Sequence, residues 1–215
     1  MHVTRHTDLD VFIDAVAPMA ARGEASASFF SGGAHAMKRT PPRAGERVYL
    51  ATCRGEGAYG AAMLRDEGQV LIGASDPAAG AAFAADLARD WPGLQGVVGA
   101  AAGCDAFVRK WKELTGRASR LRVRMRQHTL VAVNDVPAAA GMVRMASVAD
   151  AQWLIERQMA FIAEVGIPDP PARVREGMPS RIARGDFRIW NDGGPVAYAG
   201  CNDSAPDFAR IAPVY

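Results

Sequence analysis

The sequence contains no long hydrophobic run and has few cysteines or aromatic residues. Nowhere in its 215 residues do 18 apolar residues follow one another, so no transmembrane helix is predicted. The three cysteines, Cys53, Cys104 and Cys201, are odd in number and far apart, which argues against a disulfide framework and against a Cys-x-x-Cys zinc site. The four histidines also lack ligand spacing, and we expect no metal.

A strong excess of charge is also missing, because 25 basic residues face 23 acidic ones and the formal net charge is +2. This excess is too small to predict nucleic acid or a membrane as a partner. The first 14 residues carry charges before any apolar run, unlike a signal peptide, and we expect a cytoplasmic protein. With 49% hydrophobic and 22% charged residues, the chain has the composition of a folded globular protein.

The first half of the chain predicts two helices and then three antiparallel strands. Apolar residues recur at helical spacing from Leu9 to Ala20, and β-rich runs separated by short turns follow later. The further elements expected here are a helix, three strands, a helix, a strand, a helix and a long strand, over 25–39, 47–53, 58–65, 69–73, 76–91, 97–98, 106–114 and 119–133.

Residues 134–141 are expected to form a linker, because they break the periodicity and carry turn-forming residues. We therefore assign residues 1–133 to one domain and 142–215 to a second. The second domain is expected to contain a strand, two helices and three strands, over 142–146, 147–166, 169–185, 187–191, 195–201 and 207–215. The predicted fold class is α/β, mixed, with largely antiparallel sheets and helices packed on them.

The order strand, helix, helix and three strands resembles the start of the GCN5-related N-acetyltransferase (GNAT) fold. Two stretches are similar to a bacterial subgroup in which a divergent GNAT-like half precedes the acetyltransferase half: GDFRIWNDGGPVA at 185–197 and RLRVRMR at 120–126. The run ARIAPVY at 209–215 is similar to the fourth strand of the family. The resemblance implies two tandem GNAT-like units, of which the second is expected to be incomplete and to end at its fourth strand.

The resemblance also implies acetyl-CoA as a co-substrate and an amine of unknown identity as the acetyl acceptor. In the family, a glycine-rich Arg/Gln-x-x-Gly-x-Gly/Ala loop after the fourth strand binds the pyrophosphate of the cofactor. We expect the chain to end before this loop and to be inactive by itself. The positions that can be carried over are Val214 and Tyr215, whose strand corresponds to the one that pairs with the pantetheine amides.

Acetyl transfer to an amine needs a base that keeps the amine neutral, and a carboxylate near the fourth strand can serve. Glu164, Asp203 and Asp207 are the candidates. Each also has a structural interpretation. Glu164 fits a surface charge on a helix, and the two aspartates fit turn positions.

Two further patterns have a functional and a structural interpretation. Residues 55–60 match Gly-x-Gly-x-x-Gly, but strand-like residues follow them, which favours a hairpin over a dinucleotide site. Arginines alternate with apolar residues from Arg120 to Arg126, so one face of a strand would be basic. That face is either solvated or binds phosphate groups.

Two functions are therefore open. The first is a GNAT-type N-acetyltransferase that uses acetyl-CoA. The alternative is a non-catalytic ligand-binding or interaction module with a degenerate GNAT fold. A terminal strand over 208–215 without a further neighbour would in addition favour self-association through its free edge.

Overall fold

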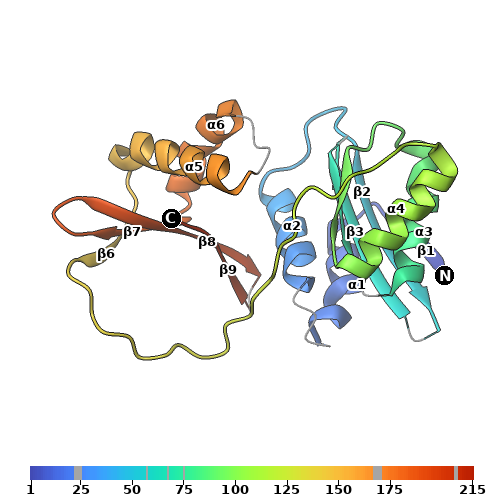
Figure 1. Cartoon of the computed structure of the whole chain (residues 1–215), viewed down its shortest axis with the longest axis horizontal. Coiled ribbons are helices and arrows are strands. Elements are labelled where there is room, and N and C mark those ends of the chain that lie inside the picture. The colour runs from blue at the N-terminus through green and yellow to red at the C-terminus, as the bar shows by residue number, and fades with distance from the viewer. Residues whose placement is uncertain (22–25, 57, 67, 75, 167–170, 206–207) are drawn as a thin grey trace. The chain divides into compact units, whose positions relative to one another are not determined.

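A computed structural model of the chain describes residues 1–21, 26–56, 58–66, 68–74, 76–166, 171–205 and 208–215, and for 202–205 and 208 it describes the backbone alone. The chain divides into two compact units, Met1–Leu130 (unit 1) and Val131–Tyr215 (unit 2), which are described separately (Figure 1). Each unit consists of helices and one largely antiparallel sheet, which confirms the predicted α/β class.

Unit 1 alternates strands and helices in a regular order along the chain. Its described elements are β1 (His2–His6), α1 (Leu9–Ala21), α2 (Ala27–Arg39), β2 (Val48–Gly55), β3 (Ala58–Arg65), β4 (Gln69–Gly73), α3 (Pro77–Asp90), β5 (Gly96–Gly99) and α4 (Ala101–Thr115). The sheet order is β1-β2-β3-β4-β5. All neighbours are antiparallel except β4 and β5, which are parallel because α3 crosses between them. Gly55 pairs with Ala58, so the glycine-rich motif is the end of a hairpin, as predicted.

The sheet of unit 1 is covered by helices on both faces, with α1 and α2 on one side and α3 and α4 on the other (Figure 1). Successive side chains of a strand point to opposite faces of the sheet, so neighbouring residues pack against different helix layers. Leu50 and Ala61 pack with Phe12 and Phe30 of α1 and α2. Their neighbours in sequence instead join the cluster around Phe83 of α3.

Helices α3 and α4 approach each other closely near their N-termini. A Cβ atom added at Gly80 of α3 would lie 2.1 Å from the carbonyl oxygen of Gly103 in α4. A Cβ atom at Gly103 would lie 2.2 Å from the carbonyl oxygen of Ala74, which follows β4. These glycines therefore let the backbones of α3, α4 and the end of β4 pack together without side chains between them.

Unit 2 is a smaller two-layer structure. Its described elements are β6 (Met142–Met145), the 3-10 helix η1 (Val148–Asp150), α5 (Ala151–Val165), α6 (Pro171–Ala183), β7 (Phe187–Asn191), β8 (Pro195–Ala205) and β9 (Phe208–Val214). The antiparallel sheet has the order β6-β7-β8-β9, so β9 forms one edge. Helices α5 and α6 cover one face, where Phe187, Ile189 and Tyr198 are buried (Figure 1). Val143, Met145 and Val214 belong to the sheet but are exposed.

The structure corrects the prediction of a strand over 119–133. Residues 116–139 form neither helix nor strand, and their side chains are exposed. The alternating pattern is right for a strand, but a strand is stable only when its backbone groups pair with a neighbour. Within the described residues, no such neighbour pairs with this segment.

Candidate functional site

The three carboxylates expected near the fourth strand are not assembled into a described site. Glu164 lies in the last turn of α5, and its side chain is exposed. Asp203 lies in β8, where its backbone is in register with Ala209, but its side chain is outside the described part of the chain. Asp207 lies outside the described residues altogether.

The two residues expected to contact the cofactor differ in which way their backbone groups face. The amide of Tyr215 donates to the carbonyl of Tyr198 at 3.0 Å, and the amide of Tyr198 donates to the carbonyl of Tyr215 at 2.8 Å. Successive residues of an antiparallel strand alternate between facing the partner and facing away. The backbone groups of Val214 therefore face the free edge of β9, whereas those of Tyr215 are used within the sheet.

Tyr198 is a polar residue near this strand that the sequence did not single out. Its buried hydroxyl donates to the side-chain oxygen of Gln158 at 3.2 Å. Its ring makes T-shaped contacts with the rings of Trp153 and Phe187. Burial raises the pKa of Tyr198 to about 12. The phenol therefore stays protonated at neutral pH and acts as a hydrogen-bond donor rather than as a base.

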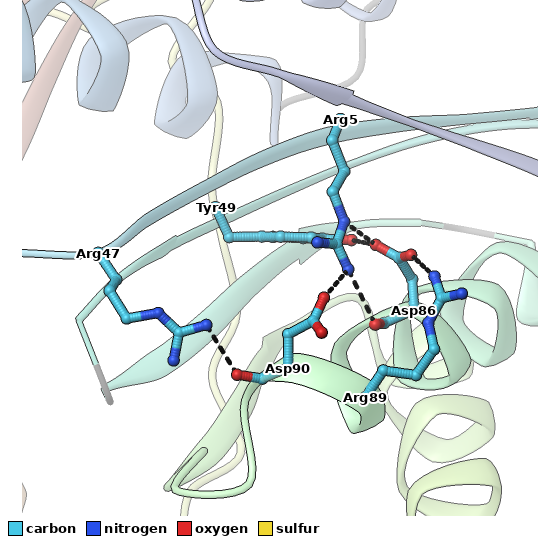
Figure 2. A network of polar contacts seen from close by, with 6 residues as sticks. All are labelled: Arg5, Arg47, Tyr49, Asp86, Arg89 and Asp90. Atoms are coloured by element: carbon cyan, nitrogen blue, oxygen red, sulfur yellow. Dashed lines mark hydrogen bonds and ion pairs between the residues drawn. The ribbon is translucent and has the colours of Figure 1, made fainter.

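The most extensive polar cluster that we find lies in unit 1, around Asp86 of α3 (Figure 2). One carboxylate oxygen, Oδ2, accepts from Nε of Arg5 and from the hydroxyl of Tyr49, both at 2.8 Å. The other oxygen, Oδ1, accepts from Arg89. Arg5 comes from β1 and Tyr49 from β2, so one buried carboxylate connects two strands to the helix that covers them.

The edge of this cluster continues to the C-terminal end of α3. Arg5 also donates to the Asp86 carbonyl at 3.1 Å and forms an ion pair with Asp90 at 2.7 Å. Arg47 donates to the Asp90 carbonyl at 2.7 Å (Figure 2). Its guanidinium carbon also lies 3.9 Å from the centre of the Trp91 ring. Arginines therefore bind the last carbonyls of the helix, where cations are favoured.

The electrostatics of the cluster indicate a structural connection rather than a catalytic base. Burial by itself raises the pKa of Asp86, but the hydrogen bonds from Arg5, Tyr49 and Arg89 outweigh it and lower the pKa overall. Burial also raises the pKa of Tyr49. A carboxylate whose two oxygens already accept three donors has little capacity left to take a proton from a substrate.

Two features of unit 1 argue against a cofactor site at the ends of its parallel strands. Asp76 precedes α3, and its carboxylate accepts from the amide of Ala78 at 2.7 Å, so a negative charge already occupies the helix N-terminus. Strand β5 remains in register with β4 as far as the pair Ile72 and Gly99. The two strands therefore leave no opening between them along the paired residues.

In unit 2, Asp150 connects β6 to the start of the first helix. Arg144 donates to both oxygens of this carboxylate at 2.7 and 2.8 Å, and the amide and hydroxyl of Ser147 donate to it at 2.8 Å. The Arg144 guanidinium and the Ser147 donors hold the pKa of Asp150 well below its usual range, although burial opposes this. The pattern is a capping box with an arginine added.

The variant Asp150→Asn is expected to destabilise unit 2 by about 1 kcal/mol at pH 7, because the charged hydrogen bonds weaken and Arg144 is partly solvated. An unfolded aspartate titrates near 3.8. The contribution of Asp150 is therefore complete above that pH and is lost as the pH falls through the lower folded pKa. Urea denaturation between pH 7 and pH 2 should show the two proteins converging in acid. Asp192→Asn, at an exposed turn, should change stability by less than ~0.5 kcal/mol.

Among the described residues, no group of three or more His, Cys, Asp or Glu side chains is arranged to hold a metal ion. None of the helices described is both long and apolar enough to cross a bilayer. The chain matches no family model, no curated protein and no solved structure.

Proposed function

We propose that this protein is a GNAT-type N-acetyltransferase that transfers the acetyl group of acetyl-CoA to an amine. The free backbone edge at Val214 carries this proposal. It lies on the third of three antiparallel strands that follow two helices, and unit 1 has the same order of a strand, two helices and three strands. The thiol composition is consistent with a reducing compartment, and we place the protein in the cytoplasm.

In this proposal, the backbone groups of Val214 pair with the amides of the pantetheine arm in the manner of an added strand. Tyr215 keeps the strand in register through its backbone hydrogen bonds to Tyr198. Its ring makes a T-shaped contact with the ring of Phe161 in α5, and the two ring centres are 6.1 Å apart. Glu164 and Asp203, together with Asp207, stay candidates for the base. The acceptor is a small-molecule or peptide amine.

Unit 1 takes a non-catalytic part in this proposal. Asp76 places a carboxylate where a pyrophosphate would bind, and repulsion between the two negative charges disfavours the cofactor there. Residues 69–80 also lack the Arg/Gln-x-x-Gly-x-Gly/Ala pattern. These observations favour the second candidate function, a ligand-binding or interaction module, for unit 1 alone.

The proposal is tested with two probes, acetyl-CoA and S-acetylpantetheine, which lacks the nucleotide and the pyrophosphate. We expect both to slow hydrogen exchange at the β9 edge at millimolar concentrations and with similar affinity, because residues 1–215 contain no recognisable pyrophosphate loop. Neither probe should protect the N-terminus of α3. Absence of protection at β9 would contradict the proposal, and binding of acetyl-CoA at α3 would assign the site to unit 1.

Two substitutions at one position separate a backbone contact from a side-chain contact. Val214→Pro removes an amide that faces away from β8, which an edge strand tolerates. We expect this variant to bind S-acetylpantetheine about tenfold more weakly, a change that corresponds to 1.4 kcal/mol. Val214→Ala keeps the amide and should bind within about twofold of the parent, a change well below 1 kcal/mol. Equal losses in both variants would show that the backbone of β9 is not the contact.

A further inference from the structure

The segment between α4 and β6 has an alternating sequence that the proposed function does not use. Four arginines occupy every second position, with apolar residues between them: Arg120, Leu121, Arg122, Val123, Arg124, Met125 and Arg126. In Figure 1 the segment runs from α4 to β6 without forming a helix or a strand. Leu121 and Met125 are each 69% exposed. Both the basic row and the apolar row are therefore accessible.

The positive charge of the protein is concentrated in this segment. Without these four arginines the chain would have 21 basic residues against 23 acidic ones, so the net charge would change from +2 to −2. Residues 114–134 contain no aspartate or glutamate at all. In the part of the chain that the structure describes, no carboxylate forms an ion pair with any of the four. Their charges are therefore available to a partner.

A simple role as a solvated linker does not account for the apolar row. A charged linker accounts for the arginines but not for the large aliphatic side chains exposed between them. The exposed residues continue beyond the arginines with Leu130, Val131 and Val133, of which Val131 is 94% exposed. Exposed apolar side chains gathered along one segment indicate a surface that a partner can cover.

Three classes of partner differ in how much of the segment they would use. Nucleic acid would neutralise the arginines but leave the apolar row in water, and the segment has no aromatic residue on which bases could stack. A lipid surface would take up the apolar row but leave unpaired backbone groups at the apolar boundary. A neighbouring β-strand pairs the backbone, covers the apolar row and can neutralise the charges.

The charge of the partner strand follows from cross-strand pairing. If two copies of the segment paired with their basic faces on the same side, arginine would lie opposite arginine in either strand direction, which is unfavourable. The edge strands β1, β6 and β9 each contain an arginine and no acidic residue, and β5 is uncharged. A strand with carboxylates on one face and apolar residues on the other is complementary to both rows.

We propose that residues 120–126 are a docking strand for an extended acidic peptide of another protein, in which Asp or Glu alternates with apolar residues. The side chains on one face of a strand repeat every ~6.6 Å, so a row of carboxylates on the partner matches the row of arginines along its length. Each pair is a cross-strand contact between opposite charges. The proposal is independent of acetyl transfer, since it uses no residue assigned to that reaction.

The test uses a capped synthetic peptide of four Glu-Val repeats, and a control peptide of four Glu followed by four Val. Fluorescence anisotropy on the whole protein should show at least about tenfold tighter binding of the alternating peptide, equivalent to 1.4 kcal/mol. Binding should weaken as the salt concentration rises, because exposed charges are screened. Equal affinity for the two peptides would overturn the proposal, since the alternation would then have no role.

Protein variants separate docking from general charge attraction. The double variant Arg122→Glu/Arg124→Glu should lose at least about tenfold in affinity for the alternating peptide. The matched control Arg173→Glu/Arg175→Glu changes the net charge equally on the exposed surface of α6 and should stay within about twofold. Val123→Pro keeps every charge but removes a backbone donor, and it should also weaken binding.

Two outcomes would contradict an acidic peptide as the partner. An equal loss in the α6 control would show that net charge alone attracts the peptide. Tighter binding of a single-stranded oligonucleotide, or of phosphatidylserine vesicles, than of the alternating peptide would assign the segment to a polyanion or to a lipid surface instead.

Discussion

Asp86→Ala is expected to destabilise unit 1 by about 3 kcal/mol, near the lower end of the range for breaking a buried ion pair. The variant leaves the hydroxyl of Tyr49 buried without its acceptor, which alone costs about 1–3 kcal/mol. It also removes the connection from β1 and β2 to α3 that Figure 2 shows. Arg5 lies closer to the surface and can be rehydrated, so the full cost of an orphaned buried charge is not expected.

A double-mutant cycle distinguishes this cluster from simple packing. Tyr49→Phe removes the hydroxyl that Asp86→Ala would orphan, so the double variant should be less destabilised than the sum of the two single variants. Hydrogen exchange of the α3 and β1 amides under mild denaturant measures the loss locally. A loss below ~1 kcal/mol for Asp86→Ala, or strict additivity, would show that the cluster does not hold α3 on the sheet.

Gly103→Ala is expected to destabilise unit 1 by about 2–3 kcal/mol, although alanine is ordinarily the better helix former by about 1 kcal/mol. The reason is the close approach of backbones, because the new methyl group would lie 2.2 Å from the carbonyl oxygen of Ala74. That oxygen belongs to the main chain after β4, so the methyl group can fit only if α4 moves.

Gly177→Ala in α6 is the matched control for this prediction. No heavy atom outside the surrounding backbone lies within 4 Å of the Cβ that it would add. Alanine should therefore stabilise unit 2 by about 0.5–1 kcal/mol through the helix propensity alone. Chemical denaturation of both variants tests the opposite signs. A stabilised Gly103→Ala protein would mean that α3 and α4 tolerate a wider separation.

Local patterns predicted those elements whose signal lies within a short stretch of chain. The β-rich runs and the short turns between them predict the hairpin strands β2, β3 and β4. Asp76 with Pro77, and the apolar spacing behind them, predict α3. Strand β1 was not predicted in the first half, because Val3 is its only large apolar residue. It becomes a strand through pairing with β2 some 50 residues later, which no local pattern records.

The same separation between local and non-local information applies to the sites. Asp86 and Arg5 are 81 residues apart, so their contact depends on how the sheet and α3 assemble. One signal was present in the sequence, since Asp86 lies three residues after Phe83 and next to Leu87, on the buried side of a helix. An acidic residue at such a position requires partners. For residues 119–133 the period of two was evident, but a period does not supply a neighbouring strand.

Trp153 shows the limit of helical spacing within a correctly predicted helix. Trp153 and Leu154 both fall on apolar positions of the helix expected over 147–166, and this spacing predicts both in the core. Leu154 is fully buried, whereas Trp153 is only half-buried against the edge of Tyr198. Tryptophan is large and is seldom fully buried, and here its side chain stays partly exposed while its ring contacts Tyr198.

The one-sided packing of unit 2 also bears on how long the protein persists in a cell. Among the described residues, unit 1 has clusters of sixteen and nine buried side chains, whereas unit 2 has a single cluster of seven. Proteases and chaperones act on whichever part of a chain opens most often, and the part with the least buried surface opens first. We therefore expect unit 2 to open, and to be recognised by proteases, before unit 1 does.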